Sequence, residues 1–106
     1  MTSKIYSIEE IKDIVAPIAQ MHGVNKVYLF GSYARGVATA SSDVDLCIDA
    51  PTLRGLFGLG GLYADFEEAL GKKLDMVTTN ALRDRNNAAF AENLRKDQVL
   101  IYDFAQ

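Results

Sequence analysis

The sequence has no tryptophan and a single cysteine, Cys47. One cysteine cannot form a disulfide within the chain. No stretch approaches the roughly 20 apolar residues that a membrane-spanning helix needs. The N-terminal residues M-T-S-K-I-Y-S also lack the apolar core of a signal peptide. These absences predict a cytoplasmic protein that does not enter a membrane.

An excess of positive charge is absent as well. The chain carries 11 Lys and Arg against 14 Asp and Glu, which gives a net charge of −3. This balance argues against a strongly basic surface, so nucleic acid is not the expected partner. The chain has 106 residues and neither repeats nor a linker-like stretch. Residues 1–106 are therefore predicted to form a single domain, too small to hold a second substrate-binding domain.

Hydrophobic periodicity predicts alternating helices and strands. Ser7 and Glu10 form the pattern of a capping box. A helix follows and contains Pro17, which lacks an N–H donor, so we expect a kink or a frayed final turn. The helix is predicted to end near His22-Gly23. The other predicted elements are strands at 26–30, 43–49, 73–78 and 99–102, a helical turn at 32–35 stopped by Gly36, and helices at 53–70 and 81–96. This order indicates an α/β or α+β sheet domain.

Four glycines between positions 55 and 61 disturb one of these helices. Each weakens a helix by roughly 1 kcal/mol relative to alanine. We therefore expect a mobile loop in its early part and a firm helix only from about Leu62 to Leu70. Gly71 is predicted to be its C-cap.

The strand at 26–30 stops at Gly31-Ser32, which suits the binding of a phosphate chain. Gly31 lets the backbone come close to a phosphate, and the amides that open the next helical turn favour an anion. Ser32 adds a hydroxyl donor. A strand followed by Gly-Ser is often only a turn, so this pattern alone does not decide the function.

Two carboxylates lie on one face of the next predicted strand. Side chains alternate along a strand, so Asp43 and Asp45 point the same way, with Cα atoms about 7 Å apart. Asp75 lies in the middle of a third predicted strand, where burial of an unpaired carboxylate would be costly. An ion pair with Lys72, Lys73 or an arginine is the alternative explanation for Asp75.

Three carboxylates that face one another repel, and a divalent cation removes the conflict. Magnesium prefers carboxylate oxygens and completes its octahedron with phosphate oxygens. Two such ions can clamp the attacking and leaving oxygens of a displacement at phosphorus. The three aspartates therefore indicate a metal-dependent site for phosphate chemistry.

The motif G-S-Y-A-R-G at 31–36, followed by S-D-V-D-L at 42–46, resembles the signature of the DNA polymerase β type of nucleotidyltransferase. The short chain and the form of the first motif are most similar to the minimal nucleotidyltransferase (MNT) family. The resemblance extends from Ser7 to Tyr102. It implies a polymerase β-like nucleotidyltransferase fold, in which helices flank a mixed β-sheet.

The resemblance also implies roles for the residues of both motifs. Gly31 and Ser32 would hold the β- and γ-phosphates of ATP. Asp43 and Asp45 would bind two magnesium ions. Asp75 would be the third metal-binding carboxylate and would help to deprotonate the acceptor hydroxyl, which attacks the α-phosphorus and releases pyrophosphate.

Two further residues of these motifs have open alternatives. The family often has a phosphate-contacting or positioning residue at the place of Ser42, but this hydroxyl could equally cap a turn. Arg35 could neutralise the triphosphate or face a partner, and it could equally be a solvated cation on the short helix.

The family resemblance implies a protein partner. The usual partner of an MNT protein is a small helical HEPN toxin, to which it transfers AMP from ATP. The chain would then be the antitoxin of a type VII-like toxin–antitoxin pair, modifying a hydroxyl of the toxin. Two alternatives stay open. One is an antitoxin that only masks its partner, and the other is a nucleotidyltransferase acting on a small molecule or an RNA end.

Four other residues are expected to lack a catalytic role. His22 at a helix end is interpreted as a dipole contact or an exposed side chain. Cys47 is interpreted as a small buried residue and Asp49 as a turn residue. Tyr33 lies within the first motif but is expected to pack.

Overall fold

The computed structural model describes residues 4–51, 53, 55–79, 92 and 96–105. The helix predicted at 81–96 lies almost wholly outside the described residues. Among the residues that are described, no helix combines the length and hydropathy needed to cross a bilayer.

A four-stranded mixed β-sheet forms the centre of the fold, with the strand order β3-β2-β1-β4. Strand β1 (Lys26–Phe30) is antiparallel to β2 (Val44–Asp49) and to β4 (Val99–Asp103). Strand β3 (Leu74–Thr78) runs parallel to β2. The predicted strands are therefore confirmed, and only their ends differ by a residue or so.

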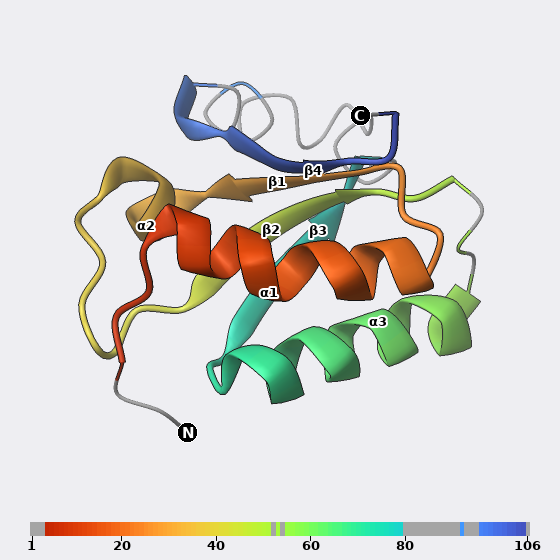
Figure 1. Ribbon diagram of the computed structural model, residues 1–106, viewed down its shortest axis with the longest axis horizontal. Coiled ribbons are helices and arrows are strands. Elements are labelled where there is room, and N and C mark those ends of the chain that lie inside the picture. Colours follow the sequence, from red (N-terminus) through yellow and green to blue (C-terminus); the bar gives the residue numbers. More distant parts are fainter. Residues whose placement is uncertain (1–3, 52, 54, 80–91, 93–95, 106) are drawn as a thin grey trace.

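Helices cover one face of this sheet. Figure 1 shows α1 (Ile8–Met21) and α3 (Gly55–Leu70) side by side across that face, while the short α2 (Gly31–Arg35) follows directly on β1. The predicted class, a mixed sheet with flanking helices, is confirmed.

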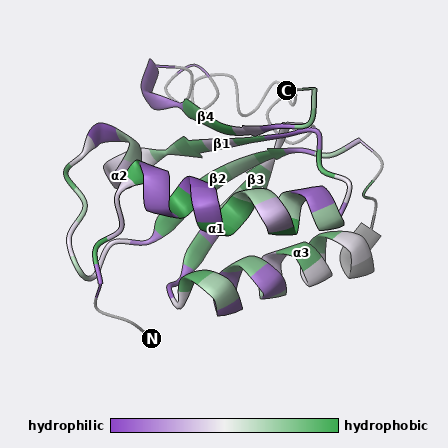
Figure 2. Ribbon diagram, in the orientation of Figure 1, coloured by the Kyte–Doolittle hydropathy of each residue, from purple (hydrophilic) through white to green (hydrophobic). Residues whose placement is uncertain are grey.

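The core lies between the two long helices and the sheet, where alternate strand residues point inward. Figure 2 shows that hydrophobic residues dominate β1 and β2. The fully buried side chains come from both layers: Ile11, Val15, Leu62, Phe66 and Leu70 from the helices, and Val27, Leu29, Val44, Leu46 and Ile48 from the strands. Burial of such side chains stabilises the fold by about 1.5–3 kcal/mol each relative to exposure.

Helix α1 begins with the predicted capping box. Ser7 Oγ accepts a hydrogen bond from the Glu10 amide at 3.1 Å, and the Ser7 amide donates to Glu10 Oε1 at 3.0 Å. The helix continues through Pro17 and ends before His22, and Gly23 follows at φ 73°. Both predicted ends of this helix are confirmed.

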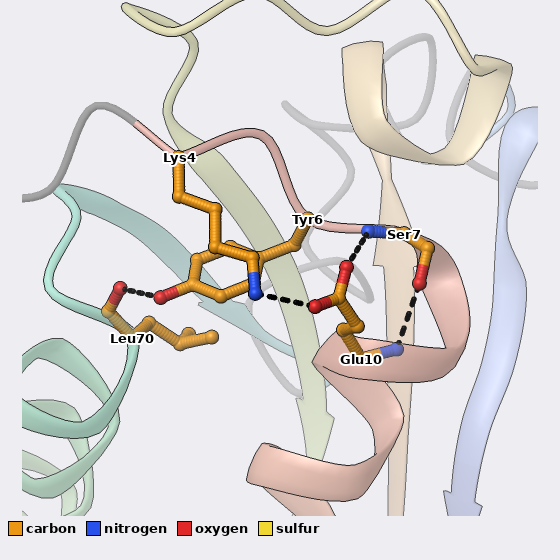
Figure 3. Close-up of polar contacts among 5 residues, drawn as sticks. All are labelled: Lys4, Tyr6, Ser7, Glu10 and Leu70. Atoms are coloured by element: carbon orange, nitrogen blue, oxygen red, sulfur yellow. Dashed lines mark hydrogen bonds and ion pairs between the residues drawn. The ribbon is translucent and has the colours of Figure 1, made fainter.

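The residues before α1 tie the start of the chain to the end of α3, as Figure 3 shows. Lys4 pairs with Glu10 at 2.5 Å and lies over the ring of Tyr6. The Tyr6 hydroxyl donates to the Leu70 carbonyl at 2.6 Å. Because Leu70 is the last residue of α3, this bond satisfies a carbonyl that has no partner within the helix.

The expectation of a mobile loop before Leu62 is wrong, because α3 already begins at Gly55. Leu62, Phe66 and Leu70 are fully buried and fix the C-terminal part of the helix against the sheet. Helix formation is cooperative, so the turns before Leu62 extend from this fixed part despite the low propensity of their glycines. Gly71 follows at φ 65°, as predicted for a C-cap.

Candidate active site

Gly31 joins β1 to α2 and lies against the carboxylate of Asp45. Its φ of 72° falls in the left-handed region that favours glycine. A Cβ at this position would collide with Asp45 Oδ2 and would lie 3.0 Å from Asp45 Cγ. Phe30, the preceding residue, pairs directly with Asp45 across the sheet. Only glycine lets the strand-to-helix turn approach this carboxylate so closely.

Helix α2 is a single turn, as predicted, and Gly36 closes it at φ 74°. Ser32 is half-buried in its first turn, and the Ser32 carbonyl accepts from the Val37 amide at 3.0 Å. Tyr33 packs into the core with 3% of its surface exposed, which confirms the packing interpretation. Within the described part of the chain, its hydroxyl has no hydrogen-bond partner.

Register brings the predicted carboxylates to one place. Asp45 and Asp75 are direct partners in the parallel β2–β3 ladder, and Asp43 precedes β2 by one residue. Burial, followed by the charges of Asp75 and Asp43, raises the pKa of the Asp45 carboxyl to about 6 from its usual 3.8. Arg35 acts in the opposite direction on this pKa. Asp45 is thus a half-buried acid next to two negative neighbours.

This cluster has the donor chemistry of a divalent-cation site, although it is not a preformed metal cage. In the described ranges, no three His, Cys, Asp or Glu side chains are already arranged to hold an ion. Asp43 and Asp75 are both exposed, so their side chains are free of tight packing. A cation between the aspartates would relieve the repulsion that Asp45 experiences.

The expectation that Asp75 is buried is wrong, because its side chain is exposed. In the described part of the sheet, β3 is an edge strand. Its inward positions alternate with outward ones, and Leu74 is buried beside the exposed Asp75. The case for Asp75 therefore rests on its register with Asp45 and not on a desolvation cost.

Ser42 and Arg35 both have partners within the protein. Ser42 Oγ accepts from the Thr39 amide at 2.8 Å, which agrees with the turn-hydroxyl interpretation. Arg35 is exposed and pairs with Asp97 Oδ2 at 3.2 Å. A contact of either residue with nucleotide stays a prediction.

The structure also shows the surroundings of the other singled-out residues. His22 caps α1, and its Nε2 lies 2.7 Å from Asp65 Oδ2 of α3, a contact that the sequence alone did not predict. Cys47 is buried, as expected, and burial raises its pKa to about 11. Asp49 ends β2, and the Thr79 hydroxyl donates to its Oδ1 at 3.4 Å.

One buried side chain was not recognised from the sequence. Lys72 has only 3% of its surface exposed, although the sequence suggested it only as an ion-pair partner of Asp75. Its Nζ donates to the Ala40 carbonyl at 3.0 Å. The signal that could have revealed it is the period-2 alternation of Leu74 and Met76 in β3, which places Lys72 on the same inward side when it is continued two residues before the strand.

The chain as a whole matches a known protein family. The profile of the family described as "Nucleotidyltransferase domain" matches residues 8–101. A candidate protein adenylyltransferase of Methanocaldococcus jannaschii is 38% identical over 94 residues, which covers 89% of this chain and 91% of the relative. The protein adenylyltransferase MntA of Thermococcus cleftensis is 32% identical over 81 residues, with 73% and 82% covered.

Solved structures share the fold. A candidate minimal nucleotidyltransferase superposes with a TM-score of 0.70 at 28% identity, covering 89% of this chain and 95% of that one. A toxin–antitoxin structure with AMP-PNP has a TM-score of 0.70 at 19% identity, covering 87% and 73%. The complex of a tri-AMPylated Shewanella oneidensis HEPN toxin with an MNT antitoxin has a TM-score of 0.67 at 15% identity, covering 93% and 75%.

Proposed function

The chain belongs to the nucleotidyltransferase domain family, as a minimal nucleotidyltransferase, and on that premise we propose that it transfers AMP from ATP to a hydroxyl of a partner protein. One observation carries the proposal. Asp45, adjacent to Asp75 and packed against Gly31, lies in a chain that is similar over most of its length to protein adenylyltransferases.

Asp43, Asp45 and Asp75 are the residues that would hold two magnesium ions. When bound, the ions neutralise charge on the phosphates and help to align the reacting oxygens. The raised pKa of Asp45 supports this assignment. The surroundings of Asp45 disfavour its ionised form, and a bound cation would stabilise that form. Gly31 and Ser32 would hold the β- and γ-phosphates, since Gly31 carries no side chain at the closest approach.

The transfer is an in-line displacement at the α-phosphorus of ATP. The acceptor oxygen forms a bond to that phosphorus, while the bond from the phosphorus to the α,β-bridging oxygen breaks and pyrophosphate leaves. Asp75 would take the proton of the acceptor hydroxyl, because its exposed position on β3 lets a substrate reach it from solvent. Arg35 would neutralise the triphosphate after leaving Asp97, and Ser42 would position the turn before Asp43.

A helical HEPN toxin is the partner that we propose, with this chain as the antitoxin of a type VII-like pair. That choice is supported by two solved structures with the same fold, a toxin–antitoxin pair with AMP-PNP and an AMPylated HEPN toxin with its MNT antitoxin.

The test is transfer of labelled AMP from ATP, with magnesium, to the protein encoded beside this chain. We expect label on that protein with wild type and none with the Asp43→Ala/Asp45→Ala double variant. Asp49→Asn is the matched control, because it changes an aspartate on the same strand outside the carboxylate cluster.

The outcome also separates the alternatives. If the double variant still neutralises the partner at equal dose, the chain acts by binding and not by catalysis. If wild type labels no neighbour-encoded protein but labels a small molecule or an RNA end, the acceptor that we propose is wrong.

A further inference from the structure

Lys72 is the charged side chain that the described part of the fold buries, with 3% of its surface exposed. A buried ammonium group is costly unless its hydrogens are bonded. Lys72 Nζ donates to the Ala40 carbonyl at 3.0 Å. This contact joins residues 32 positions apart in the sequence. It is therefore a tertiary contact and not part of a local turn.

The acceptor of this bond belongs to the segment that leads into Asp43. Residues 39–42 form a tight turn, in which the Ser42 amide donates to the Thr39 carbonyl at 3.1 Å and Ser42 Oγ accepts from the Thr39 amide at 2.8 Å. Ala40 lies within this turn and is exposed. The Lys72 side chain thus holds the turn from its protein side, three residues before the first aspartate of the candidate site.

The backbone around Lys72 is itself well anchored. The Val44 amide donates to the Lys73 carbonyl at 3.0 Å, which joins the start of β2 to the residue after Lys72. On the other side, the Gly71 amide donates to the Glu67 carbonyl at 2.8 Å. Lys72 therefore projects from a segment whose backbone is hydrogen-bonded on both sides, and its ammonium group bonds to the Ala40 carbonyl.

The same turn leads directly into β3 and Asp75. Burial alternates from Lys72 to Asp75, so that Lys72 and Leu74 face the interior while Lys73 and Asp75 face outward. One short segment consequently holds the turn before Asp43 from inside and presents Asp75 on the outer face. Lys72 is thus placed to couple the positions of two aspartates that come from different strands.

We propose that Lys72 is a positioning residue for nucleotidyl transfer, which holds the turn at 39–42 so that Asp43 is in place to bind a nucleotide-bound divalent cation. This inference rests on the proposed function. Asp43 is exposed and lies outside the strand, so the surrounding turn must define its place. Without the bond to Ala40, the turn must be ordered when the cation binds, and this ordering weakens binding.

The main variant is Lys72→Met, which keeps the length and volume of the side chain and removes its donors. Removal of one partner of a hydrogen bond costs little when the group left behind is accessible to water. The Ala40 carbonyl can bond to water instead, because Ala40 is exposed. Lys72→Arg is the conservative variant, since it keeps a donor that can reach the same carbonyl.

Tyr6→Phe is the matched control. Tyr6 anchors the same region through the Leu70 carbonyl at 2.6 Å, and this hydrogen bond does not involve the turn at 39–42. Loss of its hydroxyl should lower the melting temperature. A merely structural role of Lys72 would make Lys72→Met behave like this control.

The first measurement is binding of Mn²⁺ together with a non-hydrolysable ATP analogue whose α,β-bridging oxygen is replaced by methylene, followed by calorimetry. We expect Lys72→Met to weaken this binding by about tenfold, which corresponds to the ordering of roughly one or two side chains. Lys72→Arg should stay within about threefold of wild type, and Tyr6→Phe should bind as wild type does. Amide hydrogen exchange at 39–44 should quicken in Lys72→Met alone.

Unchanged binding by Lys72→Met overturns the proposal, as does equal weakening by Tyr6→Phe. If Lys72→Met does not fold, Lys72→Gln takes its place, and the same two outcomes decide. If wild type binds the probe but labels no partner, adenylyl transfer to a protein is contradicted. The role of Lys72 in cation binding is then still decided by the binding of its variants. A wild type that does not bind the probe overturns both proposals.

Discussion

Strand β2 carries an aspartate near each end, and the two ends differ in their surroundings. Asp45 and Asp49 are half-buried and share one face of the strand. Asp45 lies beside Asp75, with Gly31 against its carboxylate. Asp49 pairs across the sheet with Lys26 and accepts a hydrogen bond from Thr79.

The neighbours, and not the residue type, distinguish the two ends. At Asp45, burial and two further carboxylates disfavour the ionised form and raise the pKa. At Asp49, Lys26 is the register partner on the neighbouring strand, and the Thr79 hydroxyl donates to the carboxylate. A bound cation would therefore relieve repulsion at the Asp45 end of β2, whereas the carboxylate at the Asp49 end accepts a hydrogen bond from the protein itself.

The largest effect should come from Asp45→Asn. This variant keeps the shape of the side chain and removes the charge that would hold a cation. A bound metal ion stabilises the transition state by several kcal/mol. Loss of the ion should therefore lower the rate on the order of a thousandfold. The measurement is the initial rate of AMP transfer at saturating ATP. Activity within tenfold of wild type would contradict the assignment of Asp45.

The second prediction concerns Gly31 and tests its close approach to the Asp45 carboxylate. In Gly31→Ala, the new Cβ would collide with Asp45 Oδ2, and displacement of the carboxylate by about 1 Å can lower the rate on the order of a hundredfold. Gly36→Ala is the control, because Gly36 has a similar φ of 74° but nothing within 4 Å of its Cβ position.

Both glycine variants should lose stability, by about 1–3 kcal/mol from backbone strain. Only Gly31→Ala should also lose transfer activity out of proportion to its folded fraction. Thermal unfolding and initial rates, measured on the same samples, separate the two effects. Equal activity of the two variants would show that the turn tolerates a side chain beside Asp45.

The third prediction is a dependence of stability on pH. The pKa of Asp45 in the folded state is about 6, above its usual 3.8. Folded protein therefore binds this proton more tightly than the unfolded chain does, and the Asp45 contribution to stability falls as the pH rises from about 4 to about 6.

Unfolding in chelator-containing buffer across this pH range measures the effect. Asp45→Asn should lack the fall that wild type shows, whereas Asp49→Asn should follow the wild-type profile. A fall of the same size in wild type and Asp45→Asn would assign the pH dependence to other groups.

The smallest effect should come from Asp49→Asn. Its loss removes a long hydrogen bond from Thr79 at 3.4 Å and a charge opposite Lys26. We expect the free energy of unfolding to change by no more than about 0.5 kcal/mol and the transfer rate to stay near that of wild type. A large loss of activity would mean that the candidate site extends along the whole of β2.

Much of the local structure was predictable because it depends on neighbours in the sequence. The capping box at Ser7 and Glu10 formed as expected. Gly23, Gly36 and Gly71 all adopt positive φ where helices were predicted to end. Caps and left-handed turns are decided within a few residues, so the sequence contains the whole of their cause.

The helix at 55–70 shows where such local reasoning fails. Its glycines lower helix propensity, and that argument predicted a loop before Leu62. Burial of Leu62, Phe66 and Leu70 fixes the C-terminal part of the helix against the sheet, and the earlier turns extend from it because helix formation is cooperative. Residue-by-residue propensity does not include this cooperativity.

By itself, the sequence determined the strands, the turn at Gly31 and the order of the carboxylates, since alternation and backbone freedom are local properties. Tertiary structure decided that Asp45 meets Asp75, that Asp75 is exposed on β3, and that Lys72 is buried against Ala40. The first and the third of these facts join residues about 30 positions apart. They follow from strand register and layer packing, which depend on the whole chain at once.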